Sequence, residues 1–328
     1  MWLSFFLNAA LIVAAGTQLA KNAERISAKL GLGKAWAGAL LLPLATSLPE
    51  LITSRRAAII AAPDLAGGNI YGSILFNLTL IALIDLVQGR GPLTARRKRS
   101  LVVIALFSII ILVFSIIGII LALPYRLGWV GVDTIVLLVI YLLGSSMIMA
   151  LENNNRGRRK INEEDFPAVG KKEFFRSLLF FGLAAVVIIM AGTNLTDAAD
   201  MISLETGLNK TLVGSLFIAI TTSLPEVVTT MTAVHLGFVD MAIANVLGAN
   251  FFNVLLLFIT DIFYRKGPLL MNLSPQNLIT AAMGVFLSII VLISLIYPFR
   301  RQFLRMGLPS YLIIFSYLLT MVFLFFTN

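Results

Sequence analysis

Long apolar stretches alternate with short polar segments along the whole chain. Ten such stretches span approximately residues 2–20, 36–62, 65–88, 100–123, 127–151, 174–203, 211–236, 239–264, 272–297 and 307–327. Most of them have at least the roughly 20 residues that a helix needs to cross the hydrocarbon core of a bilayer. The pattern therefore predicts an all-α membrane protein with ten transmembrane helices.

The longest polar stretch divides the ten predicted helices into two sets of five. It runs from Glu152 to Glu173 and includes three consecutive asparagines and several basic residues. We therefore predict a first five-helix half over residues 1–151, a cytoplasmic linker over 152–173 and a second five-helix half over 174–328.

The composition also indicates a membrane protein. Hydrophobic residues make up 59% of the 328 residues and charged residues only 12%, whereas about a quarter of a soluble domain is charged. The chain has no cysteine and a single histidine, His235, which excludes disulfides, thiolate metal sites and a histidine-based metal centre. A net charge of +9 in such a protein usually reflects cytoplasmic loops. We therefore expect a lipid bilayer, and no nucleic acid, as the partner.

The distribution of lysine and arginine predicts the orientation. If the N-terminus lies outside, the segments predicted inside contain 19 of the 25 basic residues, and those outside contain the other six. Because basic residues concentrate on the cytoplasmic side, we predict a multi-pass protein of the cell membrane with both termini outside. No basic residue precedes Lys21, so we expect the first stretch to be a retained helix and not a cleaved signal peptide.

The two halves contain the same sequence motif at an offset of 176 residues. The segment Thr-Ser-Leu-Pro-Glu occurs at positions 46–50 and again at 222–226. Between positions 46 and 80, 14 of 35 residues are identical to the residue 176 positions later, which shared hydrophobicity alone does not explain. The chain is therefore an internal duplication of two five-helix repeats.

Helix parity makes this duplication an inverted repeat. The two motifs lie on the second and seventh predicted helices, five crossings apart, so the copies enter the membrane from opposite sides. Transporters built from inverted repeats place their site near the middle of the bilayer, on interrupted helices. Pro49 and Pro225 predict the interruption, because each proline removes a helical hydrogen-bond donor and clashes with the preceding turn.

Two glutamates are the strongest candidates for a functional site. Glu50 and Glu226 each lie well inside a long apolar stretch, where an ionised carboxylate costs at least about 2.5 kcal/mol. A carboxylate at that depth favours a role in binding the transported ion. The alternative is a pair of protonated glutamates that hydrogen-bond neighbouring helices.

Other oxygen-bearing side chains surround the two glutamates. The threonine and serine four and three residues before each glutamate share its face where the segment is helical. On the following helices, Ser73 and Asn77 are four residues apart, and Asn253 is the counterpart of Asn77. These candidate ligands are Thr46, Ser47, Ser73, Asn77, Thr222, Ser223 and Asn253.

Four further repeated residues favour structural roles. Gly72 and Gly248 allow close packing of helices. Asn69 and Asn245 could be ligands or could hold the start of their helices in place, and we favour the structural role.

The candidate ligands are all oxygen atoms, from carboxylate, hydroxyl, amide and carbonyl groups. Hard cations such as Ca²⁺ and Na⁺ prefer oxygen, whereas zinc and copper favour histidine or cysteine. Two negative charges suit anionic or neutral organic substrates poorly, and one Ca²⁺, two Na⁺ or two H⁺ would neutralise them. We therefore predict a transporter of inorganic cations, without enzymatic activity or cofactor, and hypothesise an electroneutral exchange.

These motifs resemble the α-repeats of the cation/Ca²⁺ exchanger superfamily, in particular the sodium/calcium exchanger family. The resemblance rests on the two Thr-Ser-Leu-Pro-Glu segments and on residues 68–77 and 244–253 that follow them. It implies an antiporter that exchanges Ca²⁺ for Na⁺ or H⁺ by alternating access, with the first and sixth helices sliding across a core. It also implies that Glu50 and Glu226 bind Ca²⁺ and share their oxygens with the counter-ions, and that the seven other candidate ligands complete the cation sites.

The chain departs from the family pattern at several positions. Ala249 replaces a usual serine, Asn253 stands where many members carry aspartate, and Ile74 replaces a usual asparagine. The usual glycine before the motif is Ala45 in one copy and Thr221 in the other. Because Ala249 removes an oxygen where a sodium site is expected, H⁺ becomes a strong candidate for the counter-ion.

Other functions compete with this interpretation. A transporter of Mg²⁺ or Mn²⁺ uses the same ligand type, and a cation channel could be lined by similar residues. An intramembrane protease with paired carboxylates is disfavoured, because both acids here are glutamates next to prolines. A scaffold without transport is disfavoured by the retention of both glutamates and both asparagines.

Overall fold

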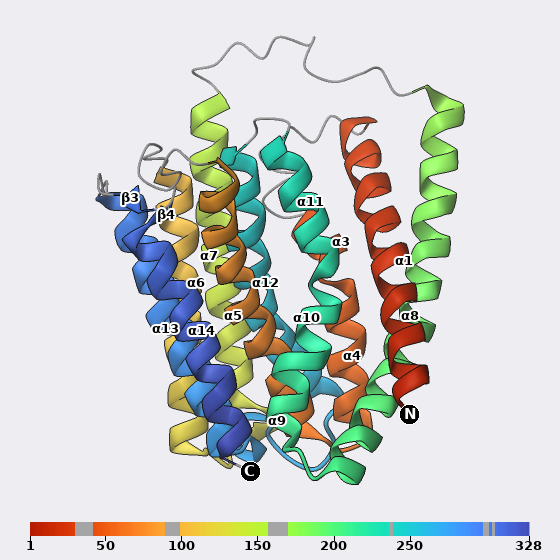
Figure 1. The fold of residues 1–328 in the computed structure, drawn as a ribbon, viewed down its shortest axis with the longest axis vertical. Helices are drawn as coiled ribbons and strands as arrows, with labels where there is room; N and C mark the ends of the chain where they lie inside the picture. The colour runs from red at the N-terminus through yellow and green to blue at the C-terminus, as the bar shows by residue number, and fades with distance from the viewer. Residues whose placement is uncertain are drawn as a thin grey trace.

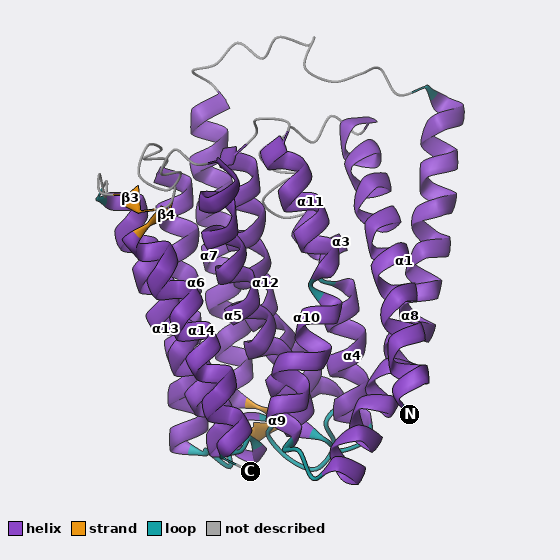
Figure 2. Cartoon of the chain, viewed as in Figure 1, coloured by secondary structure: helices purple, strands orange, loops and turns teal. Residues whose placement is uncertain are grey.

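The computed structural model describes residues 1–29, 42–88, 99–156, 170–235, 239–297, 302–303 and 306–327, almost all of which are helical (Figures 1 and 2). The first half contains α1 (Trp2–Lys29), α3 (Leu42–Thr46), α4 (Leu48–Ile59), α5 (Pro63–Gln88), α6 (Arg99–Leu121), β1 (Arg126–Leu127), β2 (Val130–Gly131) and α7 (Val132–Arg156). The second half contains α8 (Lys171–Thr206), α9 (Lys210–Leu212), a π-helix η4 (Val213–Ile218), α10 (Ala219–Thr222), α11 (Leu224–His235), α12 (Val239–Phe263), a 3₁₀ helix η5 (Leu270–Asn272), α13 (Pro275–Ile296), β3 (Gln302–Phe303), β4 (Met306–Gly307) and α14 (Leu308–Phe326).

The helices confirm a multi-pass membrane protein. Among the described residues, eight helices are long and apolar enough to cross a membrane, and nine if the bent unit formed by residues 210–222 and 224–235 is one span. The predicted segment 36–62 holds α3 and α4, and its residues 36–41 lie outside the described ranges. The count of ten therefore stays a prediction.

The ends of the chain lie at the same end of the helix bundle, as an even number of crossings requires (Figure 1). The end of α7 and the start of α8 lie at the opposite end. Both helices extend into the predicted linker, because α7 continues to Arg156 and α8 begins at Lys171. Most of the linker, residues 157–169, lies outside the described part of the chain.

The centre of the bundle is formed by α5 and α12. In these helices 78% and 83% of the membrane-spanning residues are buried, compared with 22–44% in the other six candidate spans. The outer helices expose large apolar side chains, such as Phe175 on α8 and Phe326 on α14. Because lipid is as apolar as these side chains, such exposure is normal for helices that face the bilayer.

Two short β-hairpins extend the internal repeat beyond the motifs. In β1–β2, Arg126 pairs with Gly131, and in β3–β4 Gln302 pairs with Gly307, each 176 positions later. The turn of the first hairpin uses Gly128 at φ 68°, which a residue with a side chain rarely adopts. The predicted helix 127–151 was therefore too long at its start, and α7 begins after the hairpin, at Val132.

Each hairpin is held by a buried aspartate from a central helix. Asp85 at the end of α5 accepts hydrogen bonds from the backbone N–H of Gly307 (2.7 Å) and the hydroxyl of Ser310 (2.6 Å). Each half thereby fixes the start of a helix in the other half, since the equivalent bonds recur around Asp261.

Asp261 repeats this arrangement at the opposite end of the bundle. It accepts hydrogen bonds from the Gly131 N–H (2.7 Å) and the Thr134 hydroxyl (2.6 Å), the counterparts of the two Asp85 donors. A third bond comes from the N–H of Leu269 (2.8 Å). The repeat therefore includes side-chain contacts that the alignment of motifs did not reveal.

Candidate cation site

The two Thr-Ser-Leu-Pro-Glu segments break their helices in the same way. Ser47 lies between α3 and α4 with φ −84° and ψ 10°, and Ser223 lies between α10 and α11 with φ −87° and ψ 3°. Both serines adopt the sparsely populated bridge conformation, because the proline two residues later cannot donate its share of the helical ladder. The breaks place each glutamate in the first turn of a new helix, where the helix dipole favours a negative charge.

The glutamates form hydrogen bonds across the two repeats. The Ser223 hydroxyl donates to Oε1 of Glu50 at 2.8 Å, and the Ser47 hydroxyl donates to Oε1 of Glu226 at 3.3 Å. Each carboxylate therefore binds the motif of the opposite repeat. The two carboxylates also lie close enough to repel each other when both are ionised.

Three further hydroxyl groups of the predicted set lie beside these carboxylates. Ser73 and Thr222 lie next to Glu50, and Thr46 lies next to Glu226. The structure thus brings together seven of the nine predicted site residues. All nine have a relative exposure of 0%, so the candidate site is enclosed on every side by protein.

Several buried oxygen atoms in this region have no hydrogen-bond partner among the residues that the structure describes. They include Oε2 of both glutamates and the hydroxyl of Ser73. An unpaired buried polar group is costly, and two ionised carboxylates without compensation are more so. The group of oxygens is therefore suited to a ligand that accepts electron pairs from all of them, either a metal cation or protons.

Asn77 and Asn253 are equally buried but stand apart from this set. Both atoms of each side-chain amide lack a hydrogen-bond partner within the described residues. No hydrogen bond in that part of the chain joins them to either glutamate. Their place in the site, one turn after Ser73 on α5 and at the matching position on α12, stays a prediction.

Asn69 has a structural role, although it holds the neighbouring helix α4 and not the start of its own helix. Its side-chain N–H group donates to the backbone carbonyl of Glu50 (3.2 Å) and to the hydroxyls of Thr53 and Ser54 (both 2.8 Å). Its oxygen accepts from Thr222 at 3.3 Å, so it also reaches the other repeat. Asn69 thereby fixes α4, which carries Glu50, against α5.

Asn245 plays the matching part in the second repeat. It donates to the hydroxyls of Thr229 (3.3 Å) and Thr230 (3.2 Å) on α11. Our sequence analysis missed these hydroxyl partners, although the identity of Thr53 and Thr229 at the 176-residue offset was a usable signal.

Gly72 serves packing, as predicted. A β-carbon at this position would overlap the backbone of Ser215 in the π-helix η4. One turn earlier, a β-carbon on Gly68 would lie 2.5 Å from the carbonyl oxygen of Thr211. The two glycines therefore allow α5 and η4 to cross at backbone distance.

The donor set does not match a resident transition-metal centre. Within the described residues, no group of three or more histidine, cysteine, aspartate or glutamate side chains could hold a metal ion. Two carboxylates with neutral hydroxyl oxygens instead suit a hard cation that is bound and released.

Comparison with known proteins gives a consistent result. The model of the family described as sodium/calcium exchanger protein matches residues 1–149 and 176–327. An uncharacterized membrane protein, MJ0091, of Methanocaldococcus jannaschii is 26% identical over 307 residues, which are 92% of this chain and 90% of that protein. The sodium/calcium exchanger MaX1 of Methanosarcina acetivorans is 24% identical over 323 residues, 88% and 91% of the two chains.

A solved structure shares the fold. The crystal structure of the H⁺/Ca²⁺ exchanger CAX superposes with a TM-score of 0.69, over 99% of this chain and 87% of that chain, at 12% sequence identity. At this identity the likeness concerns the fold alone.

Proposed function

The chain belongs to the sodium/calcium exchanger protein family, and on that basis we propose that it is a secondary active antiporter that exchanges Ca²⁺ for Na⁺ or H⁺ by alternating access. The protein is a multi-pass membrane transporter of the cation/Ca²⁺ antiporter class. MaX1 is a sodium/calcium exchanger and CAX an H⁺/Ca²⁺ exchanger by name, so the relatives support both counter-ions.

One observation carries the proposal. Glu50 and Glu226 come from opposite repeats and are fully buried. Each accepts a hydrogen bond from the serine of the other motif, and its second oxygen has no partner among the described residues. Such a pair can be ionised only with compensating positive charge. One Ca²⁺ would neutralise both carboxylates, and Ca²⁺ takes six to eight oxygen ligands, of which carboxylates are the usual charged ones.

The remaining predicted residues complete this site in our proposal. The hydroxyls of Ser47 and Ser223 orient the carboxylates, and Thr46, Ser73 and Thr222 supply neutral oxygens. Asn77 and Asn253 contribute amide oxygens when the ion is bound. Because every ligand comes from a broken helix or from the central helices, sliding of the first and sixth helices across this set would open the site to one side at a time.

The exchange of Ca²⁺ for a counter-ion follows from the need to neutralise the two carboxylates. When Ca²⁺ leaves, the two carboxylates need two Na⁺ or two H⁺ before the site can be enclosed again, which gives an electroneutral cycle. Ser73 lies beside Glu50, but its counterpart Ala249 is buried and has no hydroxyl. The Glu226 side therefore has one oxygen fewer for Na⁺, which favours H⁺ as the counter-ion.

The orientation follows the distribution of basic residues. We place both termini outside the cell membrane and the linker, residues 152–173, in the cytoplasm. In this arrangement α1 and α8 are the first and sixth helices, which slide across the core formed by α3–α5 and α9–α12.

Ca²⁺ uptake into proteoliposomes tests the proposal. Purified protein would be reconstituted into vesicles, one set with an outward Na⁺ gradient and another with a pH gradient. The Glu50→Gln variant would be measured under the same conditions. Uptake driven by either gradient and abolished in the variant is the expected result. No Ca²⁺ uptake in either set, together with uptake of Mg²⁺ or Mn²⁺, would reassign the substrate. Transport current that scales with Ca²⁺ flux would overturn the electroneutral cycle.

A further inference from the structure

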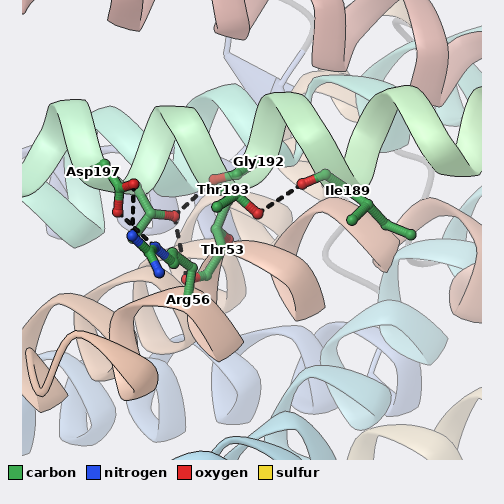
Figure 3. A network of polar contacts seen from close by, with 7 residues as sticks. Thr53, Arg56, Ile189, Gly192, Thr193 and Asp197 are labelled. Atoms are coloured by element: carbon green, nitrogen blue, oxygen red, sulfur yellow. Dashed lines mark hydrogen bonds and ion pairs between the residues drawn. The ribbon is translucent and has the colours of Figure 1, made fainter.

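A bidentate ion pair joins α8 to the helix that carries Glu50 (Figure 3). Arg56 on α4 donates through Nε to Oδ1 of Asp197 (2.7 Å) and through Nη2 to Oδ2 (2.8 Å). One residue earlier on α8, the Thr196 hydroxyl lies 3.3 Å from the Thr53 carbonyl oxygen. The pair is partly buried, with side-chain exposures of 32% and 40%, so it is neither fully screened by solvent nor part of the enclosed site.

Near this ion pair, α8 contacts α4 at a defined position along each helix. Gly192 of α8 packs against α4, where a β-carbon would lie 3.1 Å from Cγ2 of Ile52 and 3.5 Å from Cγ2 of Thr53. The contact is close because Gly192 has no side chain. Gly192 lies five residues before Asp197 on α8, so the position of this glycine along α4 determines whether Asp197 is level with Arg56.

The equivalent contact in the other repeat has a different register. Gly16 of α1, the counterpart of Gly192, packs against Pro225 of α11, where a β-carbon on the glycine would overlap Cγ of the proline and lie 3.0 Å from its Cβ. Pro225 is the counterpart of Pro49 and not of Ile52 or Thr53. The contact on α8 is therefore displaced by three to four residues along its partner helix, or about 5 Å at the rise of an α-helix.

The ion pair also has no counterpart in the other repeat. The residue equivalent to Arg56 is Thr232, and the residue equivalent to Asp197 is Lys21. Thr232 instead donates its hydroxyl to the Val228 carbonyl within α11 (2.7 Å). A threonine and a lysine cannot form an ion pair in any register.

We propose that Arg56 and Asp197 form a latch that stabilises one end state of the transport cycle and has no equivalent in the other. The inference rests on the proposed alternating-access function. If the repeats exchange their local arrangements between the two end states, Gly192 moves to the level of Pro49 in the second state. Asp197 then lies about 5 Å further from Arg56 along α4, and the two parallel hydrogen bonds are lost. The latch thus shifts the equilibrium between the two states toward the state in which Arg56 and Asp197 are paired.

A change in populations measures such a latch directly. A contact present in only one of two states shifts their ratio by its full strength. A partly exposed ion pair with bidentate geometry corresponds to a shift of about fivefold. Because the chain contains no cysteine, pairs of introduced cysteines can carry spin labels without removing any native residue.

The experiment is a double-mutant cycle read by electron–electron distance measurements. Labels would be placed at Leu204 on α8 and Leu127 in β1, which are 69% and 74% exposed. The measured quantity is the ratio of molecules with the distance of the described state to molecules with the second distance. We expect Arg56→Gln and Asp197→Asn each to lower this ratio about fivefold. The double variant should give the same ratio as either single variant. The charge exchange Arg56→Asp with Asp197→Arg should restore part of the wild-type ratio that Arg56→Asp alone abolishes.

Matched variants keep the test decisive. Glu173 is an exposed acid on the same helix and has no ion-pair partner within the described residues. Its substitution, Glu173→Gln, should leave the distances unchanged. Arg56→Lys keeps the charge without the bidentate geometry and should give an intermediate ratio, also if Arg56→Gln does not fold. Unchanged populations in the Arg56 and Asp197 variants, or additive effects in the double variant, would overturn the latch. Absence of Ca²⁺ uptake by the wild-type protein in the same vesicles would instead overturn the proposed function.

Discussion

On the Glu50 side of the candidate site, Ser73 places a hydroxyl beside the carboxylate, whereas on the Glu226 side the equivalent residue is the buried Ala249. The scaffolds around the two glutamates are nevertheless alike. Both helices break at a serine, and both glutamates accept a bond from the opposite motif. The duplication has therefore kept the scaffold and four of the five pairs of proposed ligands, and only the pair Ser73 and Ala249 has diverged. An inverted repeat needs matching scaffolds to work from both sides of a membrane, but an ion needs only one complete set of ligands.

The same contrast holds outside the site. The hairpins and their aspartates recur at the 176-residue offset. The ion pair between Arg56 and Asp197 does not recur. The contacts around the hairpins thus belong to the shared scaffold, whereas in our proposals the asymmetric residues affect the choice of counter-ion and of conformation.

The strongest test of equivalence between the halves removes one carboxylate at a time. Glu50→Gln and Glu226→Gln should each reduce Ca²⁺ uptake at least about 100-fold, because loss of one charge leaves the other carboxylate to balance a divalent ion alone. Initial rates of uptake in proteoliposomes measure the effect, with Glu173→Gln as the control for protein yield. A variant that retains half of the wild-type rate would show that the two glutamates act in separate sites.

The two hairpin aspartates, Asp85 and Asp261, should contribute unequally to the stability of the protein. Within the described residues, Asp261→Ala removes the acceptor of three hydrogen bonds and Asp85→Ala the acceptor of two, although the Thr134 hydroxyl keeps its bond to the Gly131 carbonyl oxygen (3.0 Å). At about 1 kcal/mol for each lost hydrogen bond, we expect the free energy of unfolding to fall by roughly 3 and 2 kcal/mol, respectively. Thermal unfolding in detergent measures the order. A lower midpoint for Asp85→Ala than for Asp261→Ala would contradict this ranking.

The Ser73 hydroxyl can be removed without changing the scaffold. Ser73→Ala makes this side resemble the Ala249 side, and we expect about a tenfold weaker apparent affinity for Ca²⁺, since one neutral oxygen ligand is worth about 1.4 kcal/mol or less. The Ca²⁺ dependence of uptake measures the change. Ser100→Ala, on α6 away from the site, is the matched control. An unchanged affinity would remove Ser73 from the proposed ligand set.

The reverse substitution, at Ala249, should have the smallest effect, and it concerns the preference between Na⁺ and H⁺. Ala249→Ser adds the missing oxygen on the Glu226 side, and we expect Na⁺-driven uptake to increase about threefold relative to uptake driven by a pH gradient. The ratio of the two rates in one preparation of vesicles provides an internal control. If the ratio falls, Ala249 does not limit the use of Na⁺.

The sequence predicted the membrane class, most of the spans that the structure describes and the depth of Glu50 and Glu226, which are fully buried. Apolar stretches and the repeated motif carry that information, because a glutamate within an apolar span has few structural alternatives. The π-helix η4 and the start of α7 at Val132 were not predictable, since both depend on packing between distant segments. The pairing of Arg56 with Asp197 is likewise a contact across 141 positions that no local pattern indicates.

If one glutamate from each repeat forms a single Ca²⁺ site, as we propose, equilibrium binding of ⁴⁵Ca²⁺ to the purified protein detects that shared site without a transport assay. Wild-type protein, Glu50→Gln, Glu226→Gln and the double variant would be compared at the same protein concentration. We expect one Ca²⁺ bound per wild-type chain and none to either single variant at concentrations that saturate the wild type. Normal binding by either single variant would contradict the shared site.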